Sequence, residues 1–178
     1  GSRGDLAATI RAVLTNPEAG VTTASSGKLS EPTIFVVSTL RALNAAVTDH
    51  PFMSDHTDDI GQKVFFPPSV FSYYSPGFRV RGTTSPTGPL AGPEFQILTT
   101  VTALERANFI GALLGGYFGT DAAIDYTPFT SIAHDPGALV DYCNLLFMGG
   151  RMSAAERSAI IAAIRVSSAS SREERART

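Results

Sequence analysis

The prolines of this chain are concentrated in one stretch. Six of the eleven prolines lie between residues 67 and 93, within VFFPPSVFSYYSPGFRVRGTTSPTGPLAGPEFQ, which spans residues 64–96. Proline fixes φ and lacks a backbone N–H, so neither a helix nor a central strand can run through such a stretch. Regular structure must therefore form on either side of it, and we expect residues 64–92 to form a long, ordered loop insertion.

Apolar residues on both sides of this loop recur at helical spacing. Near the N-terminus, Asp5 can cap a helix over residues 5–15, in which apolar side chains return every three or four positions. The same spacing predicts four further helices, over residues 30–47, 93–118, 137–150 and 151–166. No alternating pattern is long enough to predict a sheet. The predicted fold is therefore all-α, an irregular bundle of about five helices.

Local signals mark the ends of several predicted helices. Pro93 suits the first turn of the helix over 93–118. Ser153, followed three residues later by Glu156, is typical of a capping box. Residues 120–136 are predicted to form a polar loop, and residues 167–178 to begin another helix.

Composition limits the class of partner. With 178 residues, 43% hydrophobic and 17% charged, the chain can form one domain over residues 1–178 with a real core. A net charge of −2 offers no basic face for phosphates, which argues against nucleic acid and against an anionic membrane surface. No apolar run approaches the ~18 residues of a membrane span, so no transmembrane segment is predicted. Cys143 is the single cysteine, and its apolar neighbours predict a buried structural thiol.

Aromatic side chains fill the first half of the loop. They could pack the proline-fixed chain onto the helices, or they could stack on sugar rings if they stayed exposed. We expect the phenylalanines to pack, and the orientation of Tyr73 and Tyr74, the candidate binding residues, stays open. The aromatic residues are Phe65, Phe66, Phe71, Tyr73, Tyr74 and Phe78.

Residues 48–62 hold the densest group of polar side chains. Asp55, Asp58 and Asp59 are oxygen ligands of the kind that calcium takes, although their spacing departs from the EF-hand loop. The alternative interpretation is a solvated turn in which Ser54 or Asp55 caps a short helix through Ile60. We favour the cap and keep calcium as a candidate cofactor.

Two histidines are candidates for catalysis. His56 and Asp59 are three residues apart, so the carboxylate could orient the imidazole as a general base. The nearest nucleophiles in sequence would be Ser69, Ser72 and Ser75, and the absence of a G-x-S-x-G motif excludes a standard α/β-hydrolase site.

His134 lies in the second polar cluster, residues 119–137, where Asp121, Asp125 and Asp135 could serve glycoside hydrolysis or simply cap and solvate a loop. Glu105 and Arg106, inside an apolar helical pattern, predict a structural salt bridge to a neighbouring helix.

Five segments together resemble one known family. They are GDLAATIRAVLTNPEA (4–19), GKLSEPTIFVVSTLRAL (27–43), IGQKVFFPPSVFSYYSPGF (60–78), GPEFQILTTVTALERANFI (92–110) and LLFMGGRMSAAERSAII (145–161). In this order they resemble the C-terminal half of the uncharacterised bacterial family called domain of unknown function 1800. The resemblance implies a helical protein that is secreted or periplasmic. It also implies family members more than twice this length, so that a missing N-terminal half is one expected protein partner. They are often encoded beside a sulfatase-like protein.

Three functional classes remain open from the sequence. The first is a non-catalytic helical module of a larger extracytoplasmic protein, with exposed apolar patches, particularly near Thr178. The second is a hydrolase of a small ester, lactone or glycoside, metal-assisted or not, which uses His56 or His134. The third is a carbohydrate-binding module that uses Tyr73 and Tyr74. The sequence shows no signal peptide, but its opening Gly-Ser is typical of a cloning remnant.

Overall fold

A computed structural model describes residues 3–20, 28–48, 50–83 and 88–166 of the chain. Within these residues it contains seven α-helices and one very small sheet, so the all-α prediction is confirmed. The helices are α1 (Leu6–Leu14), α2 (Pro32–Ala42), α3 (His50–Asp59), α4 (Thr100–Leu114), α5 (Thr127–Ile132), α6 (Pro136–Met148) and α7 (Ala154–Val166). Two 3₁₀ helices cover Pro17–Gly20 (η1) and Pro93–Ile97 (η2). None of the helices in this described part is long and apolar enough to cross a membrane.

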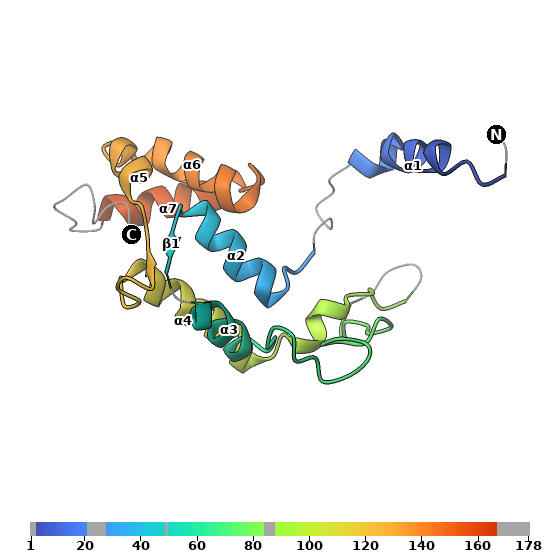
Figure 1. Ribbon diagram of the computed structural model, residues 1–178. Coiled ribbons are helices and arrows are strands. Elements are labelled where there is room, and N and C mark those ends of the chain that lie inside the picture. The colour runs from blue at the N-terminus through green and yellow to red at the C-terminus, as the bar shows by residue number, and fades with distance from the viewer. Residues whose placement is uncertain (1–2, 21–27, 49, 84–87, 167–178) are drawn as a thin grey trace.

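Helix α2 is the centre of the bundle. It packs against α3 on one side and α6 on the other, while α4 lies beside α3 and α7 lies beside α6 (Figure 1). The buried core draws on all of these helices except α7, which adds Ile164 nearby. Its members are Val36, Leu40, Leu43, Phe52, Ile60, Phe109, Leu113, Ala122, Phe129 and Leu139.

The sheet joins two connections that are distant in sequence. Strand β1 (Ala46–Val47) follows α2, strand β2 (Ala122–Ala123) follows α4, and the two pair antiparallel. Helix α2 ends at Ala42, and Asn44, with φ of 48°, turns the chain into β1. Asparagine adopts this left-handed conformation more readily than other non-glycine residues, which explains why the predicted helix over 30–47 stops early.

Two predicted helix starts are confirmed. The Asp5 carboxylate accepts a hydrogen bond from the Ala8 N–H at 2.9 Å, which caps α1. At the start of α7, the Ser153 N–H donates to the Glu156 carboxylate at 2.8 Å. The Glu156 N–H donates to the Ser153 hydroxyl at 3.2 Å, which completes the capping box.

Three other predicted boundaries are wrong. Pro93 begins the 3₁₀ helix η2, and α4 starts only at Thr100, because Thr99 and Thr102 form their own capping box. Residues 120–136 are not only a loop, since they contain β2 and α5. Helix α3 begins at His50, so Ser54 and Asp55 lie inside it and do not cap it. The predictions for residues 167–178, including a patch near Thr178, fall outside the described residues.

The prediction that the loop phenylalanines pack onto the helices is wrong for Phe65, Phe66 and Phe71, while Phe78 is half-buried. Phe65 is 92% exposed, and Phe66 and Phe71 are exposed as well, whereas Tyr73 and Tyr74 are half-buried. The loop is ordered by hydrogen bonds instead. It doubles back on itself where the Val80 N–H donates to the Leu90 carbonyl at 2.9 Å.

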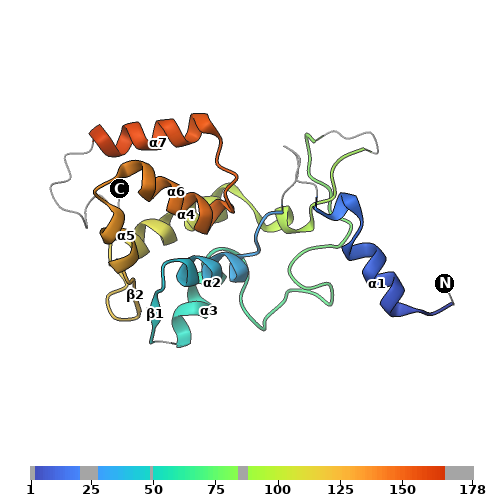
Figure 2. The same ribbon diagram turned by 90° about the horizontal axis from the view of Figure 1, so that it is seen from above.

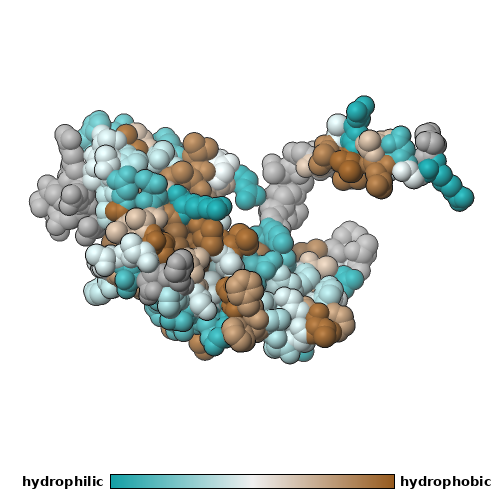
Figure 3. All heavy atoms as spheres, in the orientation of Figure 1, coloured by the Kyte–Doolittle hydropathy of each residue, from teal (hydrophilic) through white to brown (hydrophobic). Residues whose placement is uncertain are grey.

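The loop and α1 both stand to one side of the bundle. Figures 1 and 2 show the loop projecting from the end of α3 and returning to α4 through η2, away from α6 and α7. Helix α1 lies on the same side, and none of its residues is buried. Apolar side chains gather along one side of α1 and at the tip of the loop (Figure 3).

Candidate functional site

Helix α3 positions His56 among aromatic rings. The imidazole centroid lies 4.5 Å from Phe52 and 4.6 Å from Phe118, and the Phe109 ring is 5.5 Å away. Phe52 precedes His56 by one turn on α3, and Phe109 comes from α4. These contacts leave only about a quarter of the His56 side chain exposed, so one edge of the ring faces solvent.

The predicted pairing of His56 with Asp59 forms, although loosely. Asp59 follows His56 by one turn of α3, and its Oδ2 lies 3.8 Å from His56 Nδ1. This separation is longer than a hydrogen bond, so the two side chains contact each other only loosely.

A small cavity of about 130 Å³ opens beside His56. Two side chains of α4 also line this cavity, the carboxylate of Glu105 and the amide of Asn108. The Asn108 amide donates weakly to Glu105 at 3.4 Å. An imidazole that shares a cavity with two carboxylates could activate a water molecule as a general base. The cavity is lined by His56, Asp59, Ile60, Glu105, Asn108, Phe109, Ala112 and Phe118.

Glu105 was missed as a site residue because the sequence indicated a salt bridge. Within the described residues, neither Glu105 nor Arg106 forms an ion pair, so that prediction is wrong. Arg106 instead donates to the Ser30 carbonyl at 2.9 Å and lies over the Phe35 ring. Burial lowers the pKa of Arg106, and its Nε has no hydrogen-bond partner.

The other predicted catalytic groups lie elsewhere. His134 is exposed just after α5, and it does not line the cavity beside His56. None of the three loop serines lines that cavity either: Ser69 bonds within its own turn, to the Ser72 carbonyl, and the Ser75 N–H donates to Gln96. The cavity therefore offers a base without a side-chain nucleophile.

The acidic residues of the second cluster mainly serve backbone groups. Asp125 accepts hydrogen bonds from the Thr127 N–H and from Asn44, and these donors lower the pKa of Asp125. Asp135 caps α6 through the N–H groups of Gly137 and Ala138. The capping interpretation is confirmed for Asp135, while Asp125 binds groups of the turn that leads into α5.

The three candidate calcium ligands spread along one exposed face of α3. Asp58 pairs with Lys63 at 3.3 Å, and Asp59 turns toward His56. Asp55 is exposed. Across the described parts of the chain, no three His, Cys, Asp or Glu side chains come together as a metal-binding group. The calcium site stays a prediction.

Both candidate binding tyrosines turn their hydroxyls into the protein. Tyr73 donates to the Lys63 carbonyl, and Tyr74 hydrogen-bonds the Glu31 side chain. Burial, followed by the hydrogen bond to Glu31 and the charges of Glu31 and Glu94, raises the pKa of Tyr74 well above its ordinary value. The tyrosines therefore anchor the loop, while Phe65, Phe66 and Phe71 remain exposed.

The anchor of Tyr74 belongs to a polar junction at the base of the loop. Gln62 is buried, accepts two hydrogen bonds from Thr33 and donates one to Glu31. Beside it, Lys28 pairs with Glu94 at 2.9 Å. No local motif marks this junction in the sequence, since its members come from four separate segments.

Taken together, these features define a helical protein with a rigidly anchored apolar loop and one histidine–carboxylate cavity. The chain belongs to the family described as Protein of unknown function (DUF1800), whose model matches residues 1–178. No curated protein and no solved structure matches the chain. The predicted family is thus confirmed, while the correspondence to a C-terminal half stays a prediction.

Proposed function

We propose that this chain is a non-catalytic helical module that binds another protein through α1 and the loop over residues 64–78. Helix α1 carries the first half of this surface. Its apolar side chains recur at i, i+4, i+7 and i+8, which places them on one face, and Leu6 is 73% exposed. An amphipathic helix with an uncovered apolar face is the element that helix-in-groove recognition uses. The residues are Leu6, Ile10, Val13 and Leu14.

The loop carries the second half of the surface. Phe65, Phe66, Val70 and Phe71 are exposed, and Val70 reaches 95%. Such apolar side chains at the tip of an anchored loop lose little conformational entropy on binding, because the loop is already ordered. This arrangement is the single observation that carries the proposal.

The backbone of the loop adds to this argument. Phe65 has φ of 65° and Ser72 has φ of 70°, in the left-handed region that bulky side chains avoid. Strain of this kind persists where surrounding contacts impose it, and it is often found at functional sites. Phe65 gains no burial in return within the described chain, so a partner that covers its ring would supply the missing contact.

We further propose that the partner is an apolar helical surface, of the kind that the first half of a longer family member would present. Only Lys63, Arg79 and Arg81 are basic near the loop, which favours an apolar partner over a polyanion. The resemblance to extracytoplasmic proteins extends the proposal to a location in the periplasm or outside the cell.

Calorimetric titration with the first half of a full-length family member, produced separately, tests this proposal. We expect saturable binding with a negative heat-capacity change, because apolar surface becomes buried. Ile10→Ser should weaken binding by about tenfold or more. Ala8→Ser, on the opposite face of α1, is the matched control and should bind like wild type. Absence of binding, or equal affinity in the Ile10→Ser variant, would overturn the proposal.

A second candidate function rests on the cavity beside His56. We propose as an alternative that His56, supported by Asp59 and Glu105, activates water to hydrolyse a small ester, lactone or glycoside. The observation that favours it is that all three side chains line one cavity. Sugar binding by Tyr73 and Tyr74 has less support, because both hydroxyls are already engaged within the protein.

A panel of ester, lactone and glycoside substrates tests this alternative. Any turnover should be lost in His56→Ala and reduced in Glu105→Gln, while Asp55→Asn on the same helix should retain it. Turnover that survives in His56→Ala would remove this mechanism. Turnover lost only in His134→Ala would transfer the role to that histidine.

A further inference from the structure

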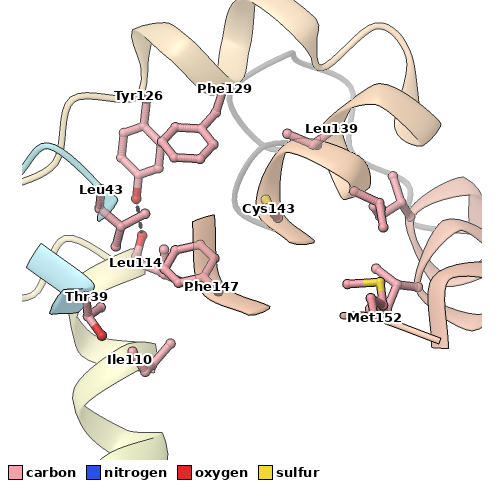
Figure 4. Close-up of a pocket in the computed structure, with 13 residues that line it drawn as sticks. Thr39, Leu43, Ile110, Leu114, Tyr126, Phe129, Leu139, Cys143, Phe147 and Met152 are labelled. Carbon is pink, nitrogen blue, oxygen red and sulfur yellow. Dashed lines mark hydrogen bonds between the residues drawn. The ribbon is translucent and has the colours of Figure 1, made fainter. Parts of the chain in front are cut away.

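A cavity with an almost wholly apolar lining lies on the other side of the bundle from the loop. It has a volume of about 320 Å³, is partly open to solvent, and is lined by residues of α2, α4, α5, α6 and α7 (Figure 4). Nearly all of its lining is aliphatic or aromatic, and no charged side chain contributes to it. The lining residues are Thr39, Leu43, Ile110, Leu114, Tyr126, Phe129, Leu139, Val140, Cys143, Phe147, Met152, Ile160 and Ile164.

The few polar groups at this cavity are weak or already engaged. The Tyr126 hydroxyl donates to the Leu114 carbonyl at 2.8 Å, the dashed contact in Figure 4. The remaining polar side chains are the Thr39 hydroxyl and the Cys143 thiol. Burial raises the pKa of Cys143, so the thiol is kept in its neutral form. A charged ligand would therefore find no counter-charge here, and water would find few hydrogen-bond partners.

From this lining we infer that the cavity is a binding site for one small, uncharged, apolar molecule. A dry cavity of about 150 Å³ accepts benzene, so roughly twice that volume suits an acyl chain or bicyclic ring of about twelve non-hydrogen atoms. The volume also falls at the lower end of ligand pockets, which span roughly 300–1,000 Å³. A whole helix of a partner would not fit within it, although one or two apolar side chains would.

The position of Cys143 provides a direct readout. Cys143 is one of the lining residues labelled in Figure 4, and it is the only cysteine of the chain. A molecule that occupies the cavity must cover the Cys143 sulfur, whereas a molecule bound to α1 or to the loop would leave it accessible. Alkylation of Cys143 by N-ethylmaleimide therefore distinguishes this site from the exposed apolar surfaces.

The experiment uses the full chain and the uncharged fluorophore 1-aminonaphthalene, a bicyclic molecule of the size that the cavity suits. We expect saturable fluorescence at one dye per chain, and about tenfold slower alkylation of Cys143 at saturation. Cys143→Phe should fill the cavity and weaken dye binding by about tenfold or more. Leu145→Phe is the matched control, since Leu145 lies on the same helix, is exposed and does not line the cavity. It should bind like wild type.

Three results would overturn the inference. They are a lack of saturable binding, alkylation that saturating dye leaves unchanged, and equal loss of binding in both variants. If Cys143→Phe does not fold, the alkylation rates of the wild-type chain decide the question alone.

Discussion

Gln62 donates a hydrogen bond to Glu31 at 3.0 Å, which joins the end of α3 to the start of α2. The same side chain also accepts from the Thr33 N–H at 2.8 Å. Glu31, the residue at the N-cap of α2, makes no capping bond of its own. Gln62 therefore satisfies a free N–H at a helix start, a task that a local residue usually performs.

We expect Gln62→Ala to destabilise the protein by about 1–3 kcal/mol, because it leaves the part-buried N–H and hydroxyl of Thr33 without their acceptor. Urea unfolding measures this loss. Gln96→Ala is the control, since Gln96 accepts a single hydrogen bond at an exposed position and should cost much less. Equal costs for the two variants would contradict the capping role of Gln62.

The raised pKa of Tyr74 predicts that the protein loses stability at high pH. Its pKa is raised in the folded protein by burial and by Glu31, so the folded state keeps its proton after the unfolded chain has lost it. Stability is thus complete below the ordinary tyrosine pKa of about 10 and falls as the pH rises through it. We expect Tyr74→Phe to flatten the dependence of unfolding free energy on pH above about pH 9. If Tyr74→Phe keeps the wild-type dependence of unfolding free energy on pH, groups other than Tyr74 cause the loss of stability.

How much of this could be predicted from sequence depends on how local each signal is. Asp5 and the Ser153–Glu156 pair contact residues within one helical turn, so their roles were visible. The start of α4 was equally local, but Pro93 fits the first turn of a 3₁₀ helix as well as that of an α-helix. The Thr99–Thr102 capping box was the better signal.

The candidate site was less predictable because its partners are distant. His56 and Asp59 could be paired from their spacing, but Glu105 and Phe118 join them only through the packing of α3 on α4. The loop was also predicted incorrectly, because aromatic rings next to prolines in sequence suggested that the phenylalanines pack onto the helices. The structure leaves the tyrosines half-buried, with partners for their hydroxyls, and leaves Phe65 exposed.

The ion pair between Asp141 and Arg157 joins α6 to α7, and we expect this contact to weaken in acid. Two hydrogen bonds, at 2.6 and 2.8 Å, join the carboxylate to the guanidinium. They lower the pKa of Asp141, so this stabilisation is present above the unfolded carboxyl pKa of about 3.9 and is lost as the pH falls below it. Asp141→Asn should lower the melting temperature at pH 7 and have little effect near pH 2. An equal decrease at both pH values would show that charge is not the cause.

The backbone conformation of Phe65 is expected to lower the stability of the free protein. Its φ of 65° costs a non-glycine residue about 1–2 kcal/mol, and its ring recovers little of this because it is 92% exposed. Glycine adopts this conformation freely but loses about 0.5–1 kcal/mol in backbone entropy. We therefore expect Phe65→Gly to leave the free energy of unfolding unchanged or to raise it by up to about 1 kcal/mol.

Phe71→Gly is the control for this strain. Phe71 is also exposed but has no positive φ, so the same substitution should destabilise the free protein slightly. If Phe65 serves the proposed interface, Phe65→Gly should weaken partner binding in the calorimetric titration while stability is kept or increased. A clear loss of stability on Phe65→Gly would show instead that the ring makes contacts that hold the free loop. Contacts of the ring within the chain would then offset the backbone strain at Phe65.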